Sequence, residues 1–114
     1  MAAGNPTLSA EMVRGCMRGA PIMTFIARDL GYDFSAYDCG LLAGNMITSA
    51  KALGIGSVCL GGPVMFMKSP AAKQYLEKLA LPEGYQLQLA IGFGYPAENP
   101  DAKPRDPEKV KWVE

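Results

Sequence analysis

Two short motifs contain residues that could hold a cofactor, and the first is a pair of glycines. Gly61-Gly62-Pro63 follows a short apolar run, Ser57–Leu60. Consecutive glycines leave the backbone bare, so a flat ligand could lie against it and accept a hydrogen bond from an amide N–H. A plain turn at the end of a strand is the competing interpretation of the same residues.

The second motif is a pair of cations close to the carboxy terminus. Lys103-Pro104-Arg105 places two positive charges on either side of a proline that restricts the backbone. If the chain curves there, both side chains could contact one phosphate group, a task that suits the planar guanidinium of arginine. Solvated surface charges are the alternative interpretation.

The rest of the composition narrows the chemistry. The chain contains no histidine, which excludes Ser-His-Asp and Cys-His catalysis and the usual zinc hydrolases. The three cysteines, Cys16, Cys39 and Cys59, have no CxxC spacing, so they predict buried or half-buried thiols and neither a disulfide framework nor a zinc site. Any chemistry must therefore come from a cofactor or from the substrate and water, unless the chain is not an enzyme.

Size and charge restrict the class of protein. A chain of 114 residues can form one small domain, and its 11 basic and 11 acidic residues balance. A net charge of zero gives no long-range attraction to nucleic acid or to an anionic membrane. No apolar stretch approaches the ~20 residues that a spanning helix needs. We therefore expect a soluble cytoplasmic protein with neither nucleic acid nor a membrane as partner.

The elements that would position the two motifs follow from hydrophobic periodicity. The pattern predicts a short helix over residues 7–16 and a buried strand over Ile22–Ala27. A long helix is predicted to run from Ser35 to Leu53, with Ser35 and Asp38 as an approximate capping box and Gly54 as its stop. Because apolar side chains surround most of this long helix, we expect a second subunit to cover part of it.

The second half of the chain predicts two strands, a helix and a tail. Ser57–Leu60 is the first strand, and Ser69 is expected to cap a helix that ends before Pro82. Alternating large apolar residues predict a strand over Tyr85–Phe93. The side chains on its opposite face become small toward the end of the strand, so another group could approach the backbone closely there. Residues 97–114 are expected to form an extended tail, in which Val110 to Val113 could add a strand to a neighbouring sheet.

In their order and spacing, these segments resemble the nitroreductase family of flavoproteins. The resemblance covers most of the chain and corresponds to the second half of a full-length family member. It is carried by Gly19-Ala20-Pro21, Asp38, Gly44-Asn45-Met46, Ala52–Ser57, Leu60-Gly61-Gly62, Leu89–Pro96, Lys103-Pro104-Arg105 and Val110–Val113.

The resemblance implies an α+β fold with a mixed sheet flanked by helices, from which the amino-terminal part of the family fold is missing. Residues 1–114 would form a single partial domain and would assemble as a homodimer with the long helix in the interface. The family binds flavin mononucleotide (FMN) between the subunits. By resemblance, the residues that would bind the flavin ring are Leu60, Gly61 and Gly62, and those that would bind its phosphate are Lys103 and Arg105.

The resemblance also implies an activity. Family members transfer hydride from NAD(P)H through the flavin to nitroaromatic, quinone or similar small-molecule acceptors, so no residue of this chain is required as a general acid or base. One alternative is a catalytically silent, nitroreductase-like dimerisation or ligand-binding module. A second alternative is an unrelated α+β domain whose glycines only form turns.

Overall fold

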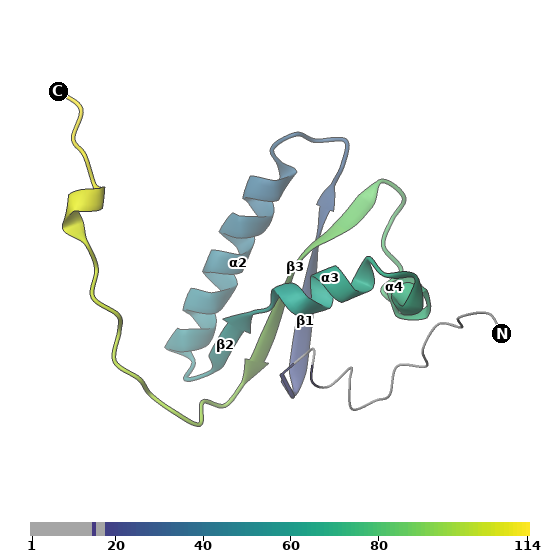
Figure 1. Ribbon diagram of the computed structural model, residues 1–114, viewed down its shortest axis with the longest axis horizontal. Helices are drawn as coiled ribbons and strands as arrows, with labels where there is room; N and C mark the ends of the chain where they lie inside the picture. Colours follow the sequence, from purple (N-terminus) through teal and green to yellow (C-terminus); the bar gives the residue numbers. More distant parts are fainter. Residues whose placement is uncertain (1–14, 16–17) are drawn as a thin grey trace.

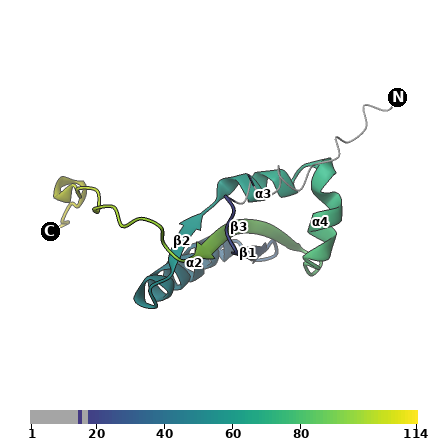
Figure 2. The same cartoon turned by 90° about the horizontal axis from the view of Figure 1, so that it is seen from below.

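The computed structural model describes Gly15 and residues 18–114, which form a three-layer arrangement (Figures 1 and 2). The helix expected over residues 7–16 lies outside this described part. The central layer is a sheet with the strand order β1 (Ile22–Asp29), β3 (Tyr85–Gly94), β2 (Gly56–Cys59). One face carries the long helix α2 (Ser35–Ala52). The other carries α3 (Gly61–Met67), a 3-10 turn η1 (Pro70–Ala72) and α4 (Lys73–Lys78).

The expected α+β class, with a sheet flanked by helices, is confirmed, and the three predicted strands are all present. Both pairings among the described strands are antiparallel. The mixed sheet that we expected would therefore need a parallel strand from outside these three. β1 and β2 each leave one edge open to such a strand.

Helix α2 begins differently from the prediction. Phe34 is its N-cap residue, so the predicted capping box of Ser35 and Asp38 does not form. Ser35 is instead buried, where its hydroxyl donates a hydrogen bond to the Asp29 carbonyl oxygen (2.7 Å) and accepts one from Arg28 Nε (3.1 Å). The hydroxyl fastens the start of the helix to the end of β1, a tertiary role that local sequence does not reveal.

The carboxy-terminal end of α2 agrees with the prediction. Gly54 has a φ of +76°, the left-handed conformation that glycine adopts without steric cost. The Gly54 amide donates to the Lys51 carbonyl (3.0 Å) and the Ile55 amide to the Ala50 carbonyl (2.8 Å), which is the Schellman pattern. This turn sends the chain directly into β2 and so places the diglycine motif at the far end of that strand.

Strand β3 does not keep one alternation along its whole length. Ile26 and Ala27 of β1 are adjacent but pair with Leu89 and Leu87, so Gln88 is an extra residue in β3. Such a bulge reverses the face to which side chains point. Leu89 consequently packs with α2, whereas Leu87 packs with α3 and α4. Our expectation that all the large residues of Tyr85–Phe93 share one face was therefore wrong.

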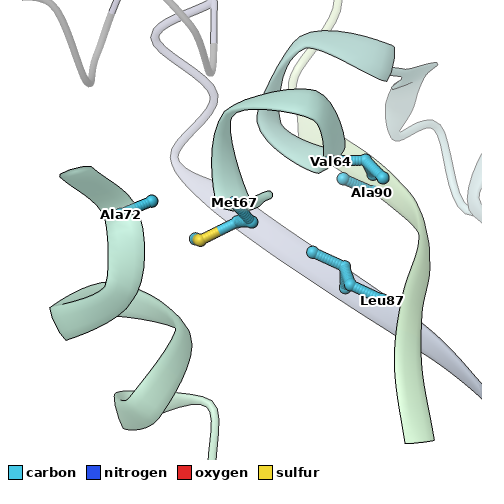
Figure 3. Packing of buried hydrophobic residues seen from close by; sticks show 5 residues of the cluster. All are labelled: Val64, Met67, Ala72, Leu87 and Ala90. Carbon is cyan, nitrogen blue, oxygen red and sulfur yellow. The ribbon is translucent and has the colours of Figure 1, made fainter. Parts of the chain in front are cut away.

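The segment after β2 is helical, although its glycines and proline predicted only a turn. Val64 and Met67 of α3 are buried against Leu87 and Ala90 of β3, and Ala72 completes this cluster (Figure 3). Burial of these side chains outweighs the poor helix propensity of the glycines.

The predicted helix beyond Ser69 is present only in part. It begins as η1, with Pro70 in the first turn, and continues as α4 to Lys78. Ser69 does not cap it with its side chain, because its hydroxyl donates back to the Phe66 carbonyl oxygen (2.7 Å).

Beyond β3 the chain leaves the body of the molecule as an extended arm (Figures 1 and 2). The radius of gyration is 17.4 Å, against about 13 Å for a compact domain of this length. The arm contains one short 3-10 turn, η2 (Pro107–Lys109), and Val110 to Val113 form no strand within the single chain. Their pairing with a neighbouring sheet stays a prediction.

Gly92 of β3 provides a test of this packing. A Cβ atom at Gly92 would lie 2.8 Å from the Ala20 Cβ and 3.4 Å from the Met23 sulfur. Gly92→Ala should therefore lower the free energy of unfolding by about 1–3 kcal/mol, the usual cost of overpacking. Denaturant titration would measure the change.

The matched control is Gly61→Ala. A Cβ atom at Gly61 would meet nothing within 4 Å, and alanine favours a helix more than glycine does, so we expect the unfolding midpoint not to fall below that of the parent protein. Equal stability of Gly92→Ala and the parent would contradict the close packing of β3 against Ala20.

Candidate functional site

The diglycine motif lies where β2 ends and α3 begins. The Leu60 amide donates to the Ala90 carbonyl oxygen (2.9 Å), which extends the pairing with β3 one residue beyond β2. Leu60 is the N-cap of α3, and Gly61 and Gly62 form its first exposed turn. The structure thus places the backbone of Leu60, Gly61 and Gly62 on a rigid sheet edge, as a cofactor-positioning segment requires.

A hollow of about 660 Å³ opens in front of this edge. It is lined by Gly15, Arg18 and the continuous run Val58–Gly62. The bare backbone at Gly61 leaves open space where other residues carry a Cβ atom. The amides in the first turn of α3 have no partners within the helix, so they are available to a hydrogen-bond acceptor.

Arg18 is a site residue that the sequence interpretation did not select. It lines the hollow beside the diglycine edge and also a second hollow at the ends of β2 and β3. Arg18 and Gly19 have φ values of +57° and +67°, so two consecutive left-handed residues turn the chain before it enters β1. The sequence carried no clear signal for this turn at Arg18, because non-glycine residues seldom adopt a positive φ.

The described cysteines have different environments. Cys39 is buried in α2, as expected, and its thiol donates a weak hydrogen bond to the Ala27 carbonyl oxygen (3.8 Å). Cys59 is exposed and lines the hollow next to Leu60, which corrects the expectation that it would be buried or half-buried. Both are free thiols. Cys16 lies outside the described residues.

Lys103 and Arg105 are not brought to this hollow within one chain. Both lie in the exposed arm, and neither lines the hollow at Gly61. The two ribbon views show the arm running away from α3 (Figures 1 and 2). Their joint action with the diglycine edge stays a prediction, and it requires the arm to be placed by something beyond the single chain.

The arrangement can bind and orient a ligand, but it offers no obvious protein-centred catalyst. A bare backbone edge, free amides and the guanidinium of Arg18 suit a flat molecule with polar or anionic atoms on its rim. Within residues 18–114 and Gly15, no cluster of three His, Cys, Asp or Glu side chains could ligate a metal ion. No helix in that part of the chain is long and apolar enough to cross a membrane.

Comparisons with known proteins show the family to which a chain with this fold belongs. The model of the nitroreductase family matches residues 7–95. A nitroreductase with bound FMN from Desulfitobacterium hafniense superimposes with a TM-score of 0.78 at 25% identity, over 92% of this chain and 60% of that one.

Two further proteins are similar to this chain in sequence. The NADPH-flavin oxidoreductase of Vibrio harveyi is 37% identical over 75 residues, which are 66% of this chain and 29% of the relative. The oxygen-insensitive NADPH nitroreductase of Salmonella typhimurium is 34% identical over 73 residues, 64% of this chain and 28% of the relative.

The chain belongs to the nitroreductase family, because the family model spans well over half of it. The predicted resemblance is confirmed, and the alternative of an unrelated α+β domain is wrong. The chain spans less than a third of the length of these two sequence relatives. The match therefore establishes family and fold, and the activity of this chain is a separate question.

Proposed function

We propose that the chain is an FMN-dependent oxidoreductase that takes hydride from NAD(P)H and delivers it to a nitroaromatic or quinone-like acceptor. The observation that carries this proposal is the bare backbone edge at Leu60–Gly62, which borders an open hollow in a nitroreductase fold. The FMN bound by the Desulfitobacterium protein, and the NADPH named for the Vibrio and Salmonella relatives, support the choice of cofactor and donor.

The residues have distinct roles in this proposal. Leu60, Gly61 and Gly62 present the backbone to the edge of the isoalloxazine ring, and Arg18 adds a positive charge beside it. Lys103 and Arg105 contact the phosphate once the arm is in place. The flavin supplies the hydride chemistry, and the protein supplies position, charge and exclusion of water. Such a protein works in the cytoplasm, without nucleic acid or membrane as partner.

The proposed assembly is a homodimer formed through the outer face of α2. The inner face of this helix, including Cys39 and Ala43, packs on the sheet. The outer face remains in water although it is apolar, with exposed side chains at Tyr37, Leu41 and Leu42. Gly40 and Gly44 lie on the exposed side one turn apart, and a Cβ at either would meet nothing within 4 Å. A second helix could approach closely there.

Uptake and reduction of flavin test the proposed activity. The purified protein should bind added FMN, and anaerobic NADPH or NADH should then bleach the visible absorbance of the oxidised flavin. Gly61→Leu should weaken FMN binding by at least about tenfold, or about 1.4 kcal/mol, because its side chain enters the hollow. Gly61→Ala, which adds one methyl group, should retain most of the affinity.

The competing function is the catalytically silent module. It is favoured by the fact that the chain matches less than a third of the length of each of the two relatives. The module would be supported if the protein retains no flavin after excess FMN has been added and the unbound FMN removed. It would also be supported if neither nucleotide reduces the flavin that is bound. Either result would exclude the oxidoreductase.

The phosphate role of the arm gives a sharper prediction. Charge-assisted hydrogen bonds contribute about 1.5–3 kcal/mol each, so the loss of two of them in Lys103→Ala with Arg105→Ala should weaken FMN binding by about a hundredfold or more. Riboflavin, which lacks the phosphate, should bind the parent and the double variant equally. The control replaces Lys109 and Lys111, two other cations of the arm. If FMN affinity falls equally in both double variants, the specific assignment fails.

The dimer makes a prediction for α2. Leu41 is 70% exposed on the outer face, so Leu41→Glu should leave the monomer folded but place two carboxylates in the proposed interface. We expect at least about a tenfold rise in the dimer dissociation constant, measured by analytical ultracentrifugation. Met65→Glu is the matched control, because Met65 is 67% exposed on α3. Equal dissociation constants for the two variants would refute this interface.

A further inference from the structure

A cleft with a volume of about 530 Å³ lies between α3, α4 and the start of β3, on the face of the sheet opposite α2. Its floor is formed by Val64, Met67 and Leu87, whose exposed fractions are only 5–9%. Figure 3 shows the Met67 side chain directed from α3 toward Ala72, with Leu87 on the neighbouring strand. Such a concave apolar floor is typical of small-molecule binding sites.

Two cations border this apolar floor. Lys68 and Lys73 are exposed, and they are the charged residues among those that line the cleft. Glu77 and Glu83 belong to the same part of the chain, but neither lines the cleft. Lys73 precedes Glu77 by four residues in α4, which is the weaker order for an ion pair on a helix. The cleft is therefore amphipathic, with positive charge beside an apolar surface.

The backbone between the two lysines is fixed by local hydrogen bonds. Lys68 is the C-cap residue of α3, and Lys73 is the first residue of α4. Between them, the Ser69 hydroxyl donates to the Phe66 carbonyl oxygen (2.7 Å), and the Ala72 amide donates to the Ser69 carbonyl oxygen (3.1 Å). Because this turn is already ordered, bringing both cations to one ligand costs less conformational entropy.

The apolar lining is aliphatic. Leu76 and Leu81 are half-buried and extend the surface formed by the three floor residues. Tyr85 is the aromatic residue of the lining, and it is 42% exposed. The flexible thioether of Met67 can adapt to an irregular chain. This surface therefore suits an aliphatic chain better than a flat ring, which would need an aromatic side chain to stack on.

We propose that the cleft is a binding site for an aliphatic carboxylate, whose chain lies on the apolar floor and whose carboxylate contacts Lys68 and Lys73. The lysine ammonium is a compact charge with rotatable donors, so two of them can hold a carboxylate at the end of a flexible chain. This site lies beyond the proposed function, because it shares no lining residue with the hollow in front of Gly61.

Octanoate is the probe that tests this site, and the full chain is used. Methyl groups of methionine and leucine are followed by NMR during titration with octanoate, octan-1-ol or octyltrimethylammonium, which share one chain length and differ in charge. We expect octanoate to shift the Met67 and Leu87 methyl signals saturably. Its dissociation constant should be at least about threefold below that of octan-1-ol, because the lysines add an attraction of surface strength. The cation should bind more weakly than the alcohol.

The lysines are tested by removing their charge. Lys68→Gln with Lys73→Gln should weaken octanoate binding by about threefold to tenfold and leave octan-1-ol binding unchanged. The matched control is Lys51→Gln with Lys109→Gln, which removes the same charge from residues that do not line the cleft. It should leave the octanoate affinity of the parent protein. All four side chains are exposed, so both double variants should keep the parent's unfolding midpoint.

A near-isosteric substitution tests the sign of the charge. Gln86 is exposed and lines the cleft, so Gln86→Glu should weaken octanoate binding and strengthen octyltrimethylammonium binding. Gln74 is exposed on α4 outside the lining, and Gln74→Glu should change neither affinity by a comparable amount.

Three results would overturn the proposal. Octanoate could shift no methyl signal saturably, or its shifts could fall on residues outside the cleft. Equal affinities for octanoate and octan-1-ol, unaffected by the loss of Lys68 and Lys73, would leave an apolar cleft without carboxylate recognition. FMN uptake is independent of these outcomes, so octanoate binding by a protein that takes up no flavin would reject the proposed oxidoreductase and keep this site.

Discussion

Strand β3 holds the layers together, because it is the strand that has a neighbour on each side among those described. Two adjacent residues in its middle, Ala90 and Ile91, are completely buried and face opposite layers. Ala90 also accepts the hydrogen bond of the Leu60 amide, so the position of the diglycine edge depends directly on β3. The edge is rigid because the central strand of a two-sided core fixes it.

Most of the regular elements could be predicted from periodicity and from helix stop signals. The three strands and α2 follow from apolar patterns, and the Gly54 stop follows from the steric freedom of glycine. The bulge at Gln88 could not be predicted, because it is defined by the pairing of β3 with β1. The same limit applies to Ser35 and Ser69, whose hydroxyl groups bond elsewhere instead of capping helices.

The candidate site was predictable where its function depends on backbone. Gly61 and Gly62 were recognisable because consecutive glycines signal bare main chain. That α3 starts at Gly61 was not, since the helix is stabilised by Val64 and Met67 packing on a sheet formed by distant residues. Arg18 was missed for a similar reason, because the left-handed turn that carries it to the hollow is a property of the folded chain.

The apolar surfaces left in water are the basis for the proposed homodimer. α2 covers the sheet with one face and exposes an apolar opposite face, and the arm holds its own apolar end away from the body. In the proposed homodimer, an arm held in place by the second copy would also restrict where Lys103 and Arg105 can lie. If the second copy orders the arm, less conformational entropy is lost when Lys103 and Arg105 bind the phosphate of FMN. Flavin affinity and dimer affinity would be linked, and each would strengthen the other by the same factor.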